Sequence, residues 1–212
     1  MPTQLANDLI AEISKIPCIN SHTHLLSEEA RLKQDVDALV LFGHAYPRAD
    51  LASAGMSAAD QQRALETGLP LGERWRIFEP YWRRIRLTGY SQAHLETFRD
   101  LFGITELTAE TVGPLSEMIR AGSRPGFYKQ ILQKRCNIVF SVMQMDDLIP
   151  VDRELFLPMP RLNRFSMVDS LEKLRALERD YNANIGSLSE HVKLIRETCA
   201  QWKRAGVAGV KL

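Results

Sequence analysis

The chain has 212 residues, of which 45% are hydrophobic and 25% charged, an ordinary composition for a globular protein. Its formal net charge of +1 gives no strong field that would favour nucleic acid or an anionic membrane surface as a partner. No apolar run approaches the roughly 20 residues that cross a bilayer, and the first residues do not resemble a signal peptide. Three widely spaced cysteines without a Cys-x-x-Cys pair indicate neither a disulfide scaffold nor a zinc ribbon. We therefore expect a cytoplasmic protein without membrane or nucleic-acid partners.

The first elements along the chain are a helix and a short strand. Apolar residues recur at helical spacing from Leu5 to Ile13, which predicts an amphipathic helix. Pro17 ends this pattern, because proline lacks a backbone donor and disfavours helix at the preceding residue. The apolar segment 18–20 then predicts a buried strand that runs into Ser-His-Thr-His.

The region of about 26–135 has a mostly helical pattern. Ser57 is suited to cap one helix, and the amphipathic stretch 73–102 is expected to be two helices broken near Thr88 and Gly89. This region is too long for a simple crossover between two strands. We interpret it as a helical insertion that follows the first strand.

The rest of the chain alternates between strand and helix patterns. Strands are predicted at 137–142, more weakly at 161–167, and at 206–212. Capping boxes at 169–172 and 187–190 predict the starts of two intervening helices. Alternation of this kind is typical of parallel βα units. We expect an α/β fold in which residues 1–212 form one domain, about the first four units of a TIM (β/α)8 barrel.

Four strands cannot close a barrel that takes eight. An open parallel sheet would leave apolar faces and an unpaired edge exposed. We therefore interpret the sequence as a fragment or a truncated gene product, and expect it to be inactive by itself.

His22 and His24 are the main candidates for chemistry. Side chains alternate along a strand, so residues two apart point to the same side. At the carboxyl end of a barrel strand, that side is where active sites of TIM barrels lie. Imidazoles bind zinc and similar ions, and zinc lowers the pKa of bound water towards about 7. The pair predicts a divalent metal site, with zinc as the expected metal.

The segment Ile-Asn-Ser-His-Thr-His-Leu resembles the first-strand signature of the amidohydrolase superfamily, usually written x-D-x-H-x-H. Asn20 stands where an aspartate is common in that family. The resemblance implies that His22 and His24 bind a catalytic metal, with further ligands and the catalytic base beyond Leu212. It also offers Lys211 as a ligand, since some members carry a carboxylated bridging lysine after the fourth strand. The alternative for Lys211 is a substrate contact or an ordinary strand end.

The segment 82–89, Trp-Arg-Arg-Ile-Arg-Leu-Thr-Gly, is similar to a W-R-x-x-R-x-x-G stretch of uronate isomerases. Arg83 and Arg86 could therefore bind a substrate carboxylate, which suits the planar guanidinium. The competing interpretation is a solvated basic helix face. His44 is a further candidate for substrate binding, and Arg161 could contact substrate or lie on the surface.

The leading functional prediction is a metal-dependent hydrolase that attacks an amide or ester bond of a small substrate, whose carboxylate the arginines would bind. The first alternative is a sugar-acid isomerase similar to uronate isomerases, or a decarboxylase, because a fold does not select among these reactions. The second alternative is a non-catalytic chain that retains two histidines by ancestry. Assembly into a homo-oligomer is left open.

Overall fold

The computed structural model describes residues 3–212. Residues 29–125 form one compact unit, and the described residues on either side of that range form the other. The first of these units is entirely helical, and the second contains a sheet. The unit 29–125 lies within the range predicted as an insertion.

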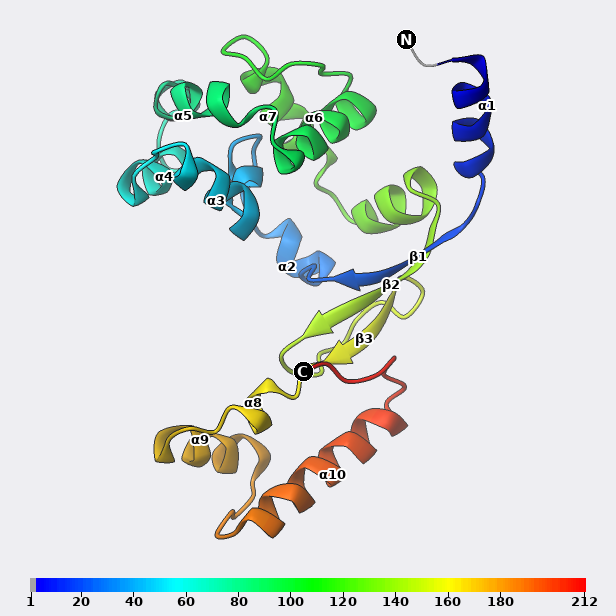
Figure 1. Ribbon diagram of the computed structural model, residues 1–212, viewed down its shortest axis with the longest axis vertical. Coiled ribbons are helices and arrows are strands. Elements are labelled where there is room, and N and C mark those ends of the chain that lie inside the picture. Colours follow the sequence, from blue (N-terminus) through cyan, green and yellow to red (C-terminus); the bar gives the residue numbers. More distant parts are fainter. Residues whose placement is uncertain (1–2) are drawn as a thin grey trace. The chain divides into compact units, whose positions relative to one another are not determined.

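The sheet has three parallel strands in the order β1-β2-β3, drawn as neighbouring arrows in Figure 1. Because all three strands run the same way, their carboxyl ends lie at one edge. The central strand β2 is buried from Ser141 onward, whereas β1 is an exposed edge strand. The strands are β1 Cys18–Thr23, β2 Ile138–Met145 and β3 Phe156–Pro160. This mixed α/β architecture agrees with the predicted class, and closure into a barrel stays a prediction.

Two of the predicted strands are wrong in detail. The third strand lies at β3 and not at 161–167, where a short helix forms instead. The last segment, 206–212, is not a strand but makes a single parallel bridge between Lys211 and Arg161. Pro158 and Pro160 explain the second difference. Their carbonyls accept bonds from the last segment, but proline has no N–H to donate in return, so a full ladder cannot form.

Within residues 3–212, five helical segments accompany the sheet in its unit. The helix α10 begins at the predicted capping box, since the Ser187 side chain accepts from the backbone N–H of Glu190 at 3.3 Å. The other box is shifted by one residue, because Ser170 caps α9 while Asp169 pairs with the Lys173 ammonium. The segments are α1 Gln4–Ile13, the π-helix η2 Lys129–Arg135, α8 Asn163–Ser166, α9 Leu171–Tyr181 and α10 Leu188–Arg204.

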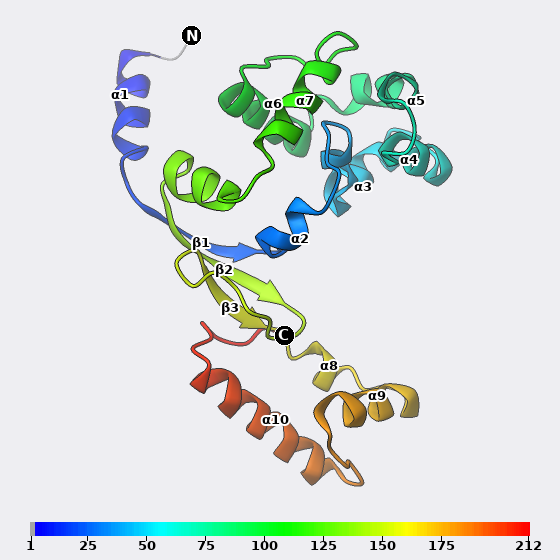
Figure 2. The ribbon, with the colours of Figure 1, turned by 180° about the vertical axis from the view of Figure 1, so that it is seen from behind.

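The red C-terminal segment lies beside β3 in both views (Figures 1 and 2), in agreement with the Lys211–Arg161 bridge. The amphipathic pattern of α1 is confirmed as a helix, yet none of its residues is buried. The buried residues of this unit instead form two clusters, one around Met143 and Phe156 and one around Phe165 and Trp202.

The helical unit packs around aromatic side chains that are almost fully buried. Phe42, Phe78 and Phe98 are 0% exposed, and Trp82 packs against the first two. The predicted break near Thr88 is present, and the Thr88 side chain caps the second helix. The elements are α2 Glu28–Leu32, the 3-10 helix η1 Val40–Gly43, α3 Ala45–Ser53, α4 Ala58–Leu65, α5 Leu71–Ile85, α6 Gly89–Phe102 and α7 Val112–Gly122. Glu28, the first residue of α2, belongs to the sheet unit.

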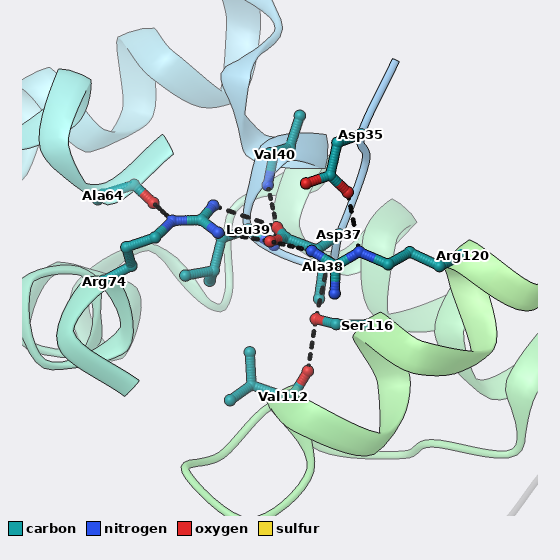
Figure 3. A network of polar contacts seen from close by, with 10 residues as sticks. All are labelled: Asp35, Asp37, Ala38, Leu39, Val40, Ala64, Arg74, Val112, Ser116 and Arg120. Atoms are coloured by element: carbon teal, nitrogen blue, oxygen red, sulfur yellow. Dashed lines mark hydrogen bonds and ion pairs between the residues drawn. The ribbon is translucent and has the colours of Figure 1, made fainter. Parts of the chain in front are cut away.

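The helical unit also contains a buried ion pair, between Arg74 and Asp37 (Figure 3). The guanidinium of Arg74 donates two bonds to the Asp37 carboxylate, at 2.5 and 3.2 Å, and both side chains are at most 1% exposed. Its Nε donates to the Ala64 carbonyl at 2.9 Å. The carboxylate also accepts from the backbone N–H groups of Leu39 and Val40, so few of its lone pairs lack a partner. The pair joins α5 to the segment before η1.

Among residues 3–212, no helix is both long enough and apolar enough to cross a membrane.

Candidate functional site

The two histidines of the sequence motif face one another at the end of β1. His22 is on the strand and His24 follows it, and their Nε2 atoms are 3.0 Å apart. The rings meet edge to face, with centroids 4.8 Å apart and planes at 72°. The Asn20 side chain accepts the backbone N–H of His22 at 3.3 Å, which ties the motif to its own strand. Both histidines are exposed, so the pair is open to a ligand.

The neighbouring strand contributes a residue that the sequence motif did not indicate. Gln144, near the end of β2, is only 6% exposed, and its Nε2 lies 2.6 Å from Nδ1 of His22. Its other amide atom, Oε1, accepts from the Lys211 ammonium at 2.6 Å. A continuous chain of polar contacts thus links Lys211 to His24. The signal for Gln144 in the sequence is a polar residue between two methionines, Met143 and Met145, just beyond the predicted strand 137–142.

Arg161 completes the group from the end of β3. Its Nη2 lies 3.3 Å from Nδ1 of His24, and its Nη1 donates to the Asp146 carboxylate at 3.3 Å. The bridge between Arg161 and Lys211 holds the backbones of these two cationic residues side by side. The structure therefore brings together His22, His24 and Lys211, which the family resemblance had grouped, and Arg161, a candidate substrate contact. Gln144 is the residue that the sequence analysis did not identify.

The spacing of the histidines is compatible with two ligands of one metal ion. Two nitrogens that are each about 2.0–2.1 Å from a tetrahedral zinc lie roughly 3.3 Å from one another, close to the 3.0 Å between the two Nε2 atoms. Within residues 3–212, however, no group of three or more His, Cys, Asp or Glu side chains could hold a metal. The donor set thus fits a metal as a pair of ligands and needs others to complete it.

Arg83 and Arg86 lie in the helical unit. They line a pocket of about 450 Å³ together with Trp75, Trp82 and Glu79. The Arg83 guanidinium donates to the Glu79 carboxylate at 2.7 Å. Both arginines are exposed, as either a carboxylate-binding role or a solvated basic face would require. Their assignment to substrate binding stays a prediction.

Trp82 and His44 are two further residues of this unit that the sequence singled out. Trp82 of the Trp-Arg-x-x-Arg motif is a core residue, and its indole N–H donates to the Leu107 carbonyl at 3.0 Å. The His44 backbone caps α3. Its exposed ring lies 5.6 Å from that of Tyr46, which stacks on Tyr90 at 5.0 Å. A substrate contact by His44 also stays a prediction.

Fold and site together define a mixed α/β protein whose parallel strands present histidine, glutamine and arginine side chains at their carboxyl ends, where the last segment adds a lysine. Among solved structures, the chain is similar to a uronate isomerase from Bacillus halodurans, with a TM-score of 0.66 and 15% sequence identity. The match covers 96% of this chain and 50% of that protein, so this chain spans half of its length. No protein-family model matches the chain, and no curated protein matches it in sequence. At this identity the similarity concerns the fold.

Proposed function

We propose that the chain is part of a metal-dependent enzyme that isomerises a small sugar acid. The observation that carries the proposal is the group formed by His22, His24, Arg161 and Lys211 at the carboxyl ends of the strands. The fold of this chain is similar to that of half of a solved uronate isomerase. This favours the isomerase alternative over the hydrolase that the histidine motif suggested first.

The charges of the group suit a carboxylate-bearing substrate. The Arg161 guanidinium contacts His24, and the Lys211 ammonium adds a second cation, linked to His22 through Gln144. The Arg161 guanidinium can bind a carboxylate through two parallel hydrogen bonds. It is half-buried, and among residues 3–212 the one carboxylate that it contacts is that of Asp146, through a single 3.3 Å bond. An incoming substrate carboxylate can therefore replace or share that contact.

In this proposal, His22 and His24 hold a divalent metal through their Nε2 atoms. When bound, such a metal supplies Lewis-acid polarisation of a carbonyl oxygen. Arg161 fixes the carboxylate end of an open-chain sugar acid, so that its carbonyl end lies towards the histidines. Isomerisation moves a proton between adjacent carbons and needs a base. We place that base outside residues 1–212, as the sequence resemblance implies.

The first test is metal content. The chain, purified and exposed to zinc, is expected to retain the metal, and His22→Ala is expected to lose it. The matched control is His94→Ala, because the His94 ring contacts backbone carbonyls and Phe42 in the helical unit and has no part in the group. Equal metal in wild type and His22→Ala would refute the metal site and leave the non-catalytic alternative.

The second test is turnover by the protein as its gene encodes it. With D-glucuronate as the probe, NMR is expected to show conversion to the keto acid, and Arg161→Met is expected to raise KM. Hydrolysis of amide or ester probes without any uronate turnover would overturn the isomerase proposal in favour of the hydrolase. The neutral variant Arg161→Met preserves most of the side-chain length, so a loss would report the guanidinium.

A further inference from the structure

The side-chain amide of Gln144 lies between Lys211 and His22, and its two ends have opposite hydrogen-bonding roles. An ammonium group can only donate, so the contact with Lys211 at 2.6 Å fixes Oε1 of Gln144 towards the lysine. The amide NH2 then faces His22 Nδ1 at 2.6 Å, and an NH2 group can only donate. Nδ1 of His22 is therefore an acceptor in this arrangement.

The tautomer of His22 follows from that contact. A neutral imidazole carries one proton, so a ring whose Nδ1 accepts must be protonated on Nε2. That Nε2–H points towards Nε2 of His24, 3.0 Å away. A metal ligand needs a lone pair, and the only lone pair on the His22 ring is at Nδ1, where Gln144 occupies it. The arrangement keeps His22 out of coordination through Nε2.

We propose that Gln144 is a positioning residue that selects the tautomer of His22, and that Lys211 holds its amide in the orientation that blocks coordination. If the amide turns over, Oε1 accepts from Nδ1–H, and the lone pair moves to Nε2. The turned amide would place its NH2 against the Lys211 ammonium, donor against donor. The amide can turn only when Lys211 gives up its bond, so metal entry at His22 and release of Lys211 are coupled.

This inference rests on the proposed metal site for its consequence, but the tautomer can be measured without metal. A long-range proton–nitrogen correlation spectrum of the full chain distinguishes protonated from unprotonated ring nitrogens. With the ring neutral, the wild-type His22 is expected to be protonated on Nε2. Gln144→Glu is expected to move the proton to Nδ1, because a carboxylate accepts from both His22 and Lys211.

Zinc affinity gives the second measurement. Gln144→Glu and Lys211→Met are each expected to raise the affinity about tenfold, in line with the influence of residues behind a metal ligand. Asn20→Asp is the control for added negative charge, because Asn20 contacts the backbone of His22 and not its ring. It is expected to leave the tautomer unchanged and to raise the affinity less than Gln144→Glu.

A wild-type His22 protonated on Nδ1, or a Gln144→Glu spectrum equal to that of Asn20→Asp, would overturn the proposal. If the wild type binds zinc, Gln144→Glu and Lys211→Met variants that bind it no more tightly would also overturn the proposal. If neither wild type nor variants bind zinc, the proposed function fails. The tautomer spectra of the metal-free protein then decide the role of Gln144 by themselves.

Discussion

Removing the buried cation Arg74 should destabilise the helical unit strongly. In Arg74→Met, the apolar side chain fills a similar volume but donates no bonds to Asp37 or to the Ala64 carbonyl. Breaking a buried ion pair by removing one partner typically costs about 3–5 kcal/mol. The Asp37 carboxylate retains two backbone N–H donors and a 3.3 Å contact with Arg120. The loss of stability should therefore lie near the lower end of that range. The unpaired carbonyl adds about 1 kcal/mol, so we expect a total of about 4 kcal/mol.

Urea unfolding measured by tryptophan fluorescence tests this value. A Trp202→Phe background leaves Trp75 and Trp82, which both lie in the helical unit, as the only indoles of the chain. The matched control is Arg63→Met, which breaks a half-exposed pair with Glu73 and should cost less than about 1 kcal/mol.

A double-mutant cycle isolates the pair itself. Combining Arg74→Met with Asp37→Asn should cost at least about 2 kcal/mol less than the sum of the single changes, because the second change removes the charge that the first leaves unpaired. Penalties that add to within about 0.5 kcal/mol would refute the reasoning.

Two further predictions concern pH and a helix cap. Burial raises the pKa of Asp37, but the hydrogen bonds and charges of its partners outweigh burial and hold the pKa below its ordinary value of 3.8. The carboxylate therefore stabilises the fold fully above that value, and less as pH falls through the lower pKa of the folded state. Asp37→Asn should make the free energy of unfolding, measured in urea titrations, depend less on pH in the acid range. An unchanged dependence on pH would contradict this prediction. Ser187→Ala removes the side-chain cap of α10 and should cost about 1 kcal/mol in thermal unfolding, whereas Leu188→Ala, at a residue 79% exposed, should change little; equal shifts would argue against capping.

Local signals in the sequence predicted most helices and the histidine pair. The capping box at Ser187, the break near Thr88 and the alternation that turns His22 and His24 to one side are all decided within a few residues. These features depend only on hydrogen bonds between near neighbours and on the two-residue period of a strand, so they can be predicted from the local sequence.

The pairing of strands required the tertiary structure. The segment at β3 contains Pro158 and Pro160, which argue against a strand from composition alone. It is nevertheless a strand, because pairing with β2 needs backbone N–H donors only on the side of β3 that faces β2. The backbones of the two prolines face the opposite side, towards the last segment. The same prolines leave Lys211 with a single bridge where the sequence pattern predicted a strand.

What the sequence determined by itself is the class of fold, the helical character of residues 29–125 and the two imidazoles at the end of the first strand. Only the tertiary structure decided that Gln144 and Arg161 contact those imidazoles and that Lys211 joins them through Gln144, because these residues are separated from His22 by more than a hundred positions along the chain. Contacts of such separation depend on which strands pair and in which register, and local patterns do not contain that information.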